Sequence, residues 1–278
     1  MVSLDLIACL KAVAMGIMEG LTEFIPISSS GHLVILSKFM HIPDDDFSKT
    51  FEVAIQLGAI LAVVWNFRAD LKDRCINLIK NKDPQERKLF LGIIIAFIPA
   101  ALVGFLFHKK IEGLLGSTYA VAIAQIVGAF IILGAEKINK TFTQKTTSLD
   151  DVTWKQALGV GVAQIASLWP GMSRSGMTIM GGLLCKLDRQ TATKFSFYLS
   201  IPIMTAATFF VVIKHRSVLT TSDHLIELFL GFVTSFIVGL AVVRFLLDYI
   251  KKHSFAPFAY YRIILGITII VLTYFNVL

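Results

Sequence analysis

Long apolar runs recur along the whole chain and are separated by short polar segments. Each run is about 20 residues long, the length that a helix needs to cross the hydrocarbon core of a bilayer. The runs occupy residues 49–67, 89–107, 118–135, 194–213, 226–247 and 259–276. This pattern predicts a polytopic helical membrane protein. Since spans and short loops use nearly all 278 residues, we expect a single integral membrane domain over 1–278.

Two further apolar segments are interrupted where a spanning helix would continue. The first runs over 4–25, meets Pro26 and a Ser-Ser-Ser-Gly sequence, and resumes as a short apolar piece. The second runs over 152–169, meets Pro170, and resumes in the same way. Proline lacks a backbone donor and clashes with the preceding turn, so we expect each first helix to end there. The short pieces cannot cross a bilayer, which predicts two re-entrant hairpins surrounded by protein or by a watery cavity.

The two interruptions resemble each other. GIMEGLTEFIPISSSG (16–31) and GVAQIASLWPGMSRSG (161–176) begin and end on glycine at the same separation. The match predicts two repeats, about 1–145 and about 146–278, each a re-entrant helical hairpin followed by three transmembrane helices. Because three crossings are an odd number, the second half is expected to be inverted relative to the first, as in many transporters. The predicted fold class is an all-α polytopic membrane protein with an inverted repeat of two five-helix halves, six full spans and about ten helices.

Composition and charge support a location in the membrane and predict which segments face the cytoplasm. Charged residues make up 16% of the chain, against about 25% in soluble domains. The net charge of +7 suits anionic lipid head groups, and we expect membrane lipids but no nucleic acid as partners. Segment 68–88 carries seven lysines and arginines, so we expect it to face the cytoplasm. Counting crossings from there, the first hairpin enters from outside and the second from the cytoplasm.

Two glutamates of the first hairpin lie where charge is costly. Glu19 and Glu23 are four residues apart on a predicted helix, so they share one face. Such a pair needs protonation or a positive partner in lipid, and its role could be structural only. The functional alternatives are a divalent-cation site, since magnesium is usually held by one or two carboxylates plus phosphate oxygens, and a general base.

Three serines and a glycine open the short helix of the first hairpin, followed by His32. They are Ser28, Ser29, Ser30 and Gly31. A helix cap explains one serine, whereas a helix start that binds an anion explains all three better. His32 follows Ser28 and Ser29 within one turn, so we expect its imidazole to reach one of their hydroxyls. The first hairpin then contains a nucleophile, a base and an orienting acid.

Arg174 is the corresponding chemical feature of the second hairpin. A guanidinium stays charged at any relevant pH and binds phosphate through a two-pronged set of donors. Around it, Ser173, Ser175 and Gly176 form a second helix start, and Thr178 follows one turn later. Arg174 could merely pair with a buried glutamate, which is compatible with function. If the hairpins meet, the site suits a highly negative group, and phosphate or diphosphate is the natural candidate.

Three of these stretches, with a fourth near the end of the chain, resemble one known family. EGLTEFIPISSSGH (19–32), FEVAIQLG (51–58), PGMSRSG (170–176) and SFAPFAYYR (254–262) resemble the bacterial undecaprenyl-diphosphate phosphatases of the bacitracin-resistance type. The resemblance covers essentially the whole chain. Ser30 stands where the family often has threonine, which keeps the hydroxyl.

The resemblance implies an enzyme that converts a C55 polyprenyl diphosphate lipid to its monophosphate, recycling the lipid carrier of peptidoglycan synthesis and countering bacitracin. It implies a multi-pass protein of the bacterial plasma membrane with an active site open to the outer face, and dependence on a divalent cation, magnesium or calcium. The implied functional positions are Glu19, Glu23, Ser29, His32 and Arg174. Glu19 and Glu23 are the expected metal ligands, and the remaining hydroxyls and glycines of the two helix starts are expected to bind substrate.

The chemistry and the function class each have alternatives. Ser29 is expected to attack the terminal phosphorus after activation by Glu23 or His32, but His32 could itself be the nucleophile. A polyprenyl-phosphate transporter or flippase would use the same anion pocket without breaking the bond. A phosphatidic-acid-type phosphatase is disfavoured because the chain lacks an Arg-Pro dipeptide. The sequence does not fix the oligomeric state, and a homodimer stays open.

Overall fold

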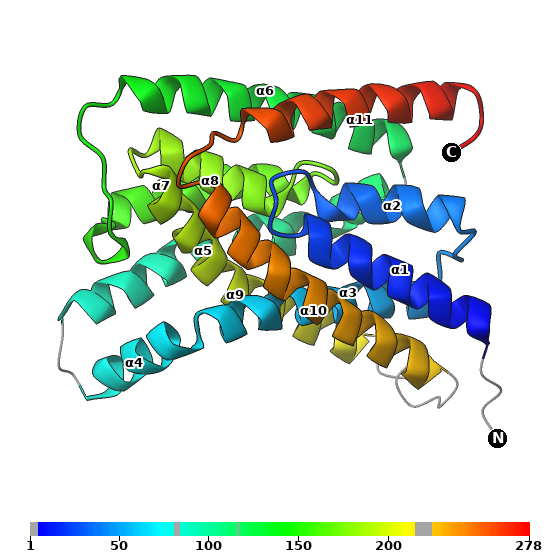
Figure 1. Ribbon diagram of the computed structural model, residues 1–278, viewed down its shortest axis with the longest axis horizontal. Helices are drawn as coiled ribbons and strands as arrows, with labels where there is room; N and C mark the ends of the chain where they lie inside the picture. Colours follow the sequence, from blue (N-terminus) through cyan, green and yellow to red (C-terminus); the bar gives the residue numbers. More distant parts are fainter. Residues whose placement is uncertain (1–4, 81–83, 116, 215–223) are drawn as a thin grey trace.

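The computed structural model describes residues 5–80, 84–115, 117–214 and 224–278, which form an all-helical fold (Figure 1). Part of the charge count for segment 68–88 therefore falls on residues 81–83, which lie outside the described residues. The α-helices are α1 (Leu6–Thr22), α2 (Ser29–Phe39), α3 (Asp46–Asn66), α4 (Arg68–Ile79), α5 (Pro84–Leu115), α6 (Thr118–Thr141), α7 (Trp154–Ile165), α8 (Arg174–Leu184), α9 (Arg189–Lys214), α10 (Leu225–Tyr249) and α11 (Ala256–Tyr274). Two short 3₁₀ helices, η1 (Leu149–Asp151) and η2 (Ala166–Leu168), flank α7.

Several helices begin at a residue whose side chain caps their free amides. Asp5 accepts from two amides of α1, Asp45 from Ser48 of α3, and Ser117 from Ala120 of α6. Thr153 and Gln156 form a reciprocal capping box at α7. Such side chains satisfy donors that have no partner within the helix, which is why these helices start where they do.

Two helix pairs, α1 with α2 and α7 with α8, occupy the interrupted segments. At 11 residues, α2 and α8 are each about 16 Å long, roughly half the thickness of a hydrocarbon core. The expectation that the first helices continue to the prolines is wrong in detail: α1 ends at Thr22, before Pro26, and α7 ends at Ile165, before Pro170. A proline lacks the backbone donor and clashes with the turn before it, and it disfavours helical conformation at the preceding residue, so both helices end before their proline.

Five helices are long and apolar enough to cross a membrane: α3, α5 over Pro84–Phe107, α6, α10 and α11. The sixth expected span corresponds to α9, which is not among the spans found within the described residues. Its first half carries Thr193, Ser196 and Ser200, all fully buried in the protein. Because this part of α9 packs against other helices and not against lipid, its side chains need not be apolar.

Segment 68–88 contains a helix that the apolar pattern does not predict. Helix α4 has no buried residue and lies at the end of the molecule opposite the N-terminus (Figure 1). Arg74 of α4 bonds to Glu86 at the start of α5 and to Asp150 of η1, at 3.0 and 2.6 Å. Burial lowers the pKa of Arg74, but hydrogen bonds to Asp150 and Asp70 outweigh it, and the net pKa lies above its ordinary value. A polar helix held by ion pairs gives no hydrophobic signal.

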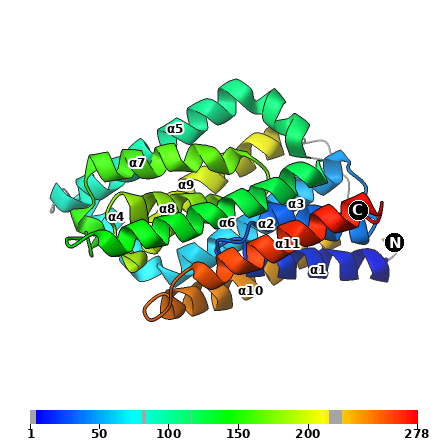
Figure 2. The ribbon, with the colours of Figure 1, turned by 90° about the horizontal axis from the view of Figure 1, so that it is seen from above.

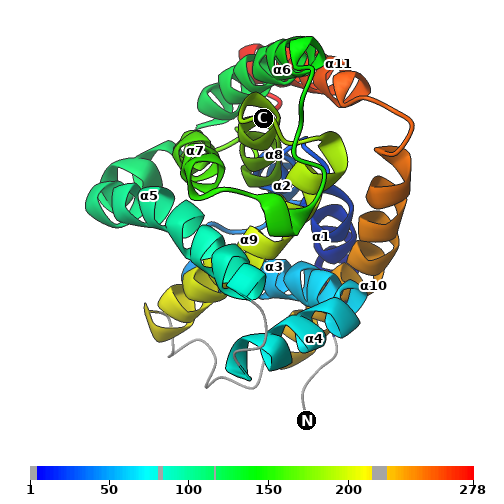
Figure 3. The same cartoon turned by 90° about the vertical axis from the view of Figure 1, so that its left-hand side faces the viewer.

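The short helices α2 and α8 lie near the centre of the molecule when it is viewed end-on (Figure 3). Helices α6 and α11 lie along the upper edge in Figure 1 and run side by side in Figure 2. Helix α10 packs across α1 and α3. Close packing of α1 on α10 depends on glycine, since a methyl group at Gly20 would lie 2.8 Å from the Ser235 carbonyl oxygen. Small residues allow helix backbones to approach closely in membranes, where no hydrophobic effect drives association.

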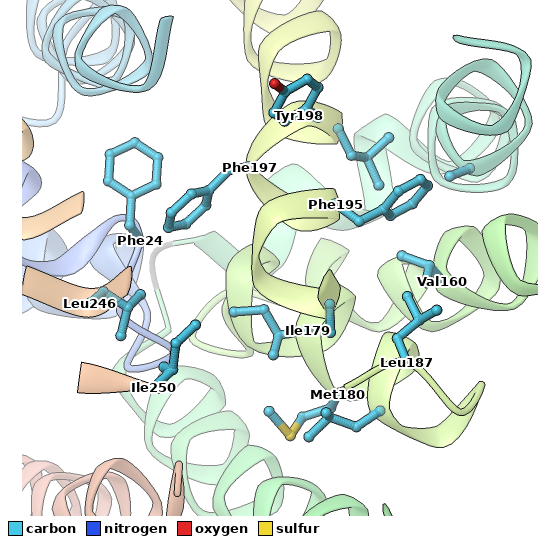
Figure 4. Close-up of a cluster of buried hydrophobic side chains, with 14 of the residues drawn as sticks. Phe24, Val160, Ile179, Met180, Leu187, Phe195, Phe197, Tyr198, Leu246 and Ile250 are labelled. Carbon is cyan, nitrogen blue, oxygen red and sulfur yellow. The ribbon is translucent and has the colours of Figure 1, made fainter. Parts of the chain in front are cut away.

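A buried apolar cluster supports the turn of the first hairpin from the α9 side (Figure 4). Phe24, next to Glu23 in the chain, meets Phe197 edge to face with ring centroids 5.3 Å apart. Both side chains are completely buried. Such a pair contributes about 0.5–1.5 kcal/mol beyond burial, and it fixes the backbone that carries Glu23 against α9.

Candidate active site

The two glutamates of the first hairpin have different surroundings. The Glu23 amide donates to the Glu19 carbonyl at 2.9 Å, so both residues keep the helical register and share one face, as expected. Glu19 is completely buried, and within the described residues neither of its carboxylate oxygens has a hydrogen-bond partner. A buried acceptor without a hydrogen-bond partner costs free energy.

The start of α2 places a serine hydroxyl on Glu23. The Ser29 Oγ donates to Glu23 Oε2 at 2.5 Å, and both residues are buried. The residue before it, Ser28, caps α2 by accepting from the Gly31 amide at 3.3 Å. Ser28 has φ 72°, a backbone conformation that non-glycine residues rarely adopt and that is typically retained where the surrounding structure enforces it.

The start of α8 brings the arginine to the same carboxylate. Arg174 Nη2 donates to Glu23 Oε1 at 2.9 Å, and the two side chains are only 11% and 6% exposed. Arg174 Nη1 donates to the Ser196 carbonyl of α9 at 3.2 Å. Glu23 therefore bridges Ser29 and Arg174, which are contributed by the two different hairpins.

The second helix start repeats the geometry of the first. Ser173 has φ 77° and accepts from the Gly176 amide at 3.0 Å. The two short helices thus begin with the same strained serine cap and the same serine-to-glycine hydrogen bond. Their positive ends point toward a shared region because the residues that follow the caps, Ser29 and Arg174, both contact Glu23.

The structure corrects the expected contact of His32. Its Nδ1 lies 2.7 Å from the Ser28 carbonyl oxygen, and its Nε2 lies 2.7 Å from the Tyr261 hydroxyl on α11. Neither nitrogen bonds to a serine hydroxyl. Helical side chains lean toward the N-terminus of their helix, which brings the imidazole onto the carbonyl one turn earlier.

The remaining expected substrate-binding hydroxyls are held by neighbours in this conformation. Ser175 donates to the Ile25 carbonyl at 3.2 Å, which connects the second hairpin to the first turn. The Thr178 hydroxyl lies 2.6 Å from that of Ser196 and is completely buried. The Ser30 hydroxyl lies 3.2 Å from that of Ser28, and Ser30 faces a cavity. Their roles in substrate binding stay predictions.

That cavity has a volume of about 880 Å³ and lies beside the start of α2. Ser30 and Pro170 line it together with the beginning of α1 and the α2–α3 connection. Lys11, Lys38 and Lys49 stand along it. The volume is of the order found for ligand sites. The three lysines share the lining with six carboxylates, Asp5, Asp44, Asp45, Asp46, Glu52 and Glu227, so the charge of the lining as a whole does not favour an anion.

Two residues on α11 contact the site and are missing from the expected set. The Tyr261 and His32 rings are nearly parallel, with planes 4° apart and centroids 5.7 Å apart, and are joined by the hydrogen bond. Arg262 is completely buried and donates to backbone carbonyls of both hairpin turns. The sequence did contain a signal for them, which is a tyrosine–arginine pair within an otherwise apolar span. An ionisable residue in such a span indicates a functional role by default.

Fold and site together define a multi-pass helical membrane protein with a buried carboxylate–hydroxyl–guanidinium group at the junction of two short helices. The sequence matches the family described as bacitracin resistance protein BacA over residues 12–268. The chain belongs to this family.

Proteins named undecaprenyl-diphosphatase are similar along almost their entire length. The one from Methylobacillus flagellatus is 45% identical over 275 residues, covering 98% of this chain and 100% of the relative. The one from Nitrosomonas europaea is 46% identical, covering 98% and 97%. The one from Laribacter hongkongensis is 47% identical, covering 96% of each chain. The sequence resemblance to this family is confirmed.

Proposed function

We propose that this protein hydrolyses undecaprenyl diphosphate to undecaprenyl phosphate and inorganic phosphate, the activity for which its relatives are named. The observation that supports this site for the reaction is the contact of Glu23 with both Ser29 and Arg174. This contact combines a base, a nucleophile and a phosphoryl-binding cation at one buried point. Recycling of the peptidoglycan lipid carrier and resistance to bacitracin follow from this activity.

Ser29 is the proposed nucleophile and Glu23 the proposed base. The Ser29 Oγ forms a bond to the terminal phosphorus while the bond from that phosphorus to the bridging oxygen breaks, and undecaprenyl phosphate leaves. Glu23 takes the hydroxyl proton, for which it is already placed at 2.5 Å. Water then attacks the phosphoserine, and Glu23 returns the proton to Ser29 as phosphate leaves. Arg174 stabilises the charge on the phosphoryl oxygens in both steps.

His32 is proposed to position α2 instead of attacking phosphorus. Both of its ring nitrogens have partners, the Ser28 carbonyl and the Tyr261 hydroxyl. An imidazole nucleophile would have to release one of them first. The contact to Tyr261 connects the helix start that carries Ser29 to α11, which supports a role in orientation.

A divalent cation is proposed to bind beside Glu19 and Glu23. The residues fit such an ion because the carboxylate of Glu19 is buried without a hydrogen-bond partner. No group of three or more potential ligands that could hold a metal is found among the described residues. Two carboxylates plus substrate oxygens and water are nevertheless a usual set for magnesium. When bound, the ion would neutralise negative charge on the diphosphate.

The cavity is proposed to open to the outer face of the membrane. It lies at the start of α1, whereas the basic segment that contains α4 lies at the opposite end of the molecule (Figure 1). Because basic segments favour the cytoplasm, this arrangement supports entry of the diphosphate from outside. The isoprenoid tail would then remain among the exposed apolar side chains of the spanning helices.

The two halves are proposed to form an inverted repeat. The matching backbone conformation of Ser28 and Ser173, and the matching caps onto Gly31 and Gly176, support it. An inverted arrangement would bring two helix starts from opposite sides of the membrane to one point.

Phosphate release by purified protein in detergent tests the function. Wild-type protein should release one phosphate per undecaprenyl diphosphate, and a chelator should suppress the release. Absence of release from folded wild-type protein would favour the alternative, a polyprenyl-phosphate transporter. That alternative would then be measured as movement of the lipid across vesicles.

A further inference from the structure

Arg262 is the largest completely buried side chain of the described residues, and every donor of its guanidinium is used. The acceptors are the carbonyl oxygens of Gln125 (from Nε, 3.2 Å), Pro26 and Met172 (from Nη1, 3.1 and 3.0 Å), and Gly171 and Ala124 (from Nη2, 2.9 and 3.0 Å). A guanidinium has five N–H groups in a fixed plane, and five carbonyls accept them here.

These carbonyls belong to three separate parts of the chain: the turn of the first hairpin, the turn of the second, and helix α6. The single nitrogen Nη1 bonds to Pro26 in one turn and to Met172 in the other. Pro26 lies between Glu23 and Ser29, and Met172 lies just before Arg174. Arg262 therefore joins the two backbone segments that carry the reacting groups.

A second contact strengthens the same junction. Gln125, whose carbonyl accepts from Arg262, donates its own amide to the Ile27 carbonyl at 3.0 Å. Helix α6 thus contacts the first turn next to Pro26. Burying a cation whose only partners are carbonyl dipoles costs free energy. An apolar side chain would fill the same space without this cost, so packing alone does not explain an arginine at this position.

Helix α6 has a glycine that makes room for the guanidinium. A methyl group at Gly128 would lie 2.6 Å from Arg262 Cζ. Gly134, on the same helix, has no atom within 4 Å of such a methyl. The two glycines therefore form a matched pair, one against the guanidinium and the other in open space.

We propose that Arg262 is a positioning residue for the phosphatase reaction, which holds the two hairpin turns together and thereby sets the distance of Arg174 to Glu23 and Ser29. The inference rests on the proposed function. Lysine would keep the charge of Arg262, but its three donors radiate from one point and cannot reach carbonyls on three segments. The geometry of the guanidinium, and not its charge alone, is what the site requires.

The test uses full-length protein in detergent with the variants Arg262→Lys and Gly128→Ala, and the controls Arg244→Lys and Gly134→Ala. Arg244 is exposed and bonds to Asn66, away from the hairpin turns. We expect kcat of Arg262→Lys to fall about 100-fold, with a smaller change in KM, because small misplacement of reacting groups has effects of this size. Gly128→Ala should lower kcat in the same way, and both controls should retain the wild-type kcat.

A readout independent of activity separates this proposal from the proposed function. Met172→Cys, made after replacement of the native cysteines, places a buried thiol in the second turn. Its labelling by a water-soluble maleimide should accelerate about tenfold when Arg262→Lys is added, because the turn is released. If wild-type protein releases no phosphate, the proposed function fails and the labelling rate alone decides on Arg262.

Two results would overturn the positioning role. One is a wild-type kcat in Arg262→Lys together with an unchanged labelling rate. The other is a loss of activity that only follows the loss of folded protein, as measured by thermal unfolding, since that describes a structural role. If Arg262→Lys does not fold, Gly128→Ala is judged by the same two criteria.

Discussion

Replacing Glu23 by glutamine separates a catalytic carboxylate from a structural ion pair. In the wild type, Glu23 Oε2 accepts from the Ser29 hydroxyl at 2.5 Å and Oε1 accepts from Arg174 at 2.9 Å. Glutamine keeps the shape and one oxygen acceptor. When that oxygen faces Arg174, the amide nitrogen faces Ser29, and the hydroxyl has no base to receive its proton.

The structure gives a magnitude for each role. The side chains of Glu23 and Arg174 are only 6% and 11% exposed, so removing the charge of one leaves the charge of the other uncompensated. Breaking a buried pair this way costs about 3–5 kcal/mol of stability, and less here because the glutamine oxygen still accepts from Arg174. Loss of a general base lowers kcat by about 10² to 10⁴.

The assay measures phosphate release and thermal unfolding for Glu23→Gln, Arg174→Gln and the double variant. Removing both charges should restore much of the stability, since no unpaired charge remains. Activity should stay low in the double variant because base and phosphoryl-binding group are both missing. A double variant that regains stability and activity together would refute the catalytic role of Glu23.

Three further outcomes are expected. Tyr261→Phe removes only the hydroxyl that bonds to His32. Its kcat should fall about tenfold, the effect of roughly one hydrogen bond, with unchanged thermal unfolding. A loss of kcat as large as that of His32→Ala would contradict a purely orienting contact. Glu136→Gln breaks the pair with Arg189 far from the site and should lower stability by up to about 3–5 kcal/mol, while kcat per folded molecule stays constant. Chelation should stop phosphate release and added magnesium or calcium should restore it, with Glu19→Gln requiring a higher cation concentration; release unaffected by chelation would contradict the cation site.

Much of the architecture follows from the apolar pattern, because a spanning helix must be long and apolar. The spans α3, α5, α6, α10 and α11 appear where the runs predict them. Helix α4 was missed because a polar helix held by ion pairs has no apolar periodicity. Helix α9 is not among the spans found within the described residues, and the polar residues of its first half pack inside the protein.

The site shows the same division between local and long-range information. Glu19, Glu23 and the serines of α2 are close in sequence, so helix geometry relates them directly. The contact between Arg174 and Glu23 joins residues 151 positions apart, and only the expectation that the hairpins meet anticipates it. The predicted contact of His32 with a serine hydroxyl was wrong because Tyr261, 229 positions away, competes for its Nε2. Arg262 was missed as a site residue because its acceptors are backbone carbonyls, which sequence does not distinguish.

The central claim is tested most directly by the rate of phosphate release from undecaprenyl diphosphate. The rate of Arg174→Ala is compared with that of wild type at equal amounts of folded protein. Arg244→Ala is the control, because its arginine is exposed and bonds to Asn66 away from the hairpins. We expect steady release by wild type and control, and a loss of at least about 10² in Arg174→Ala, as for other residues that stabilise transition-state charge. Equal release by Arg174→Ala and wild type would show that the junction of the two hairpins is not where the diphosphate is hydrolysed.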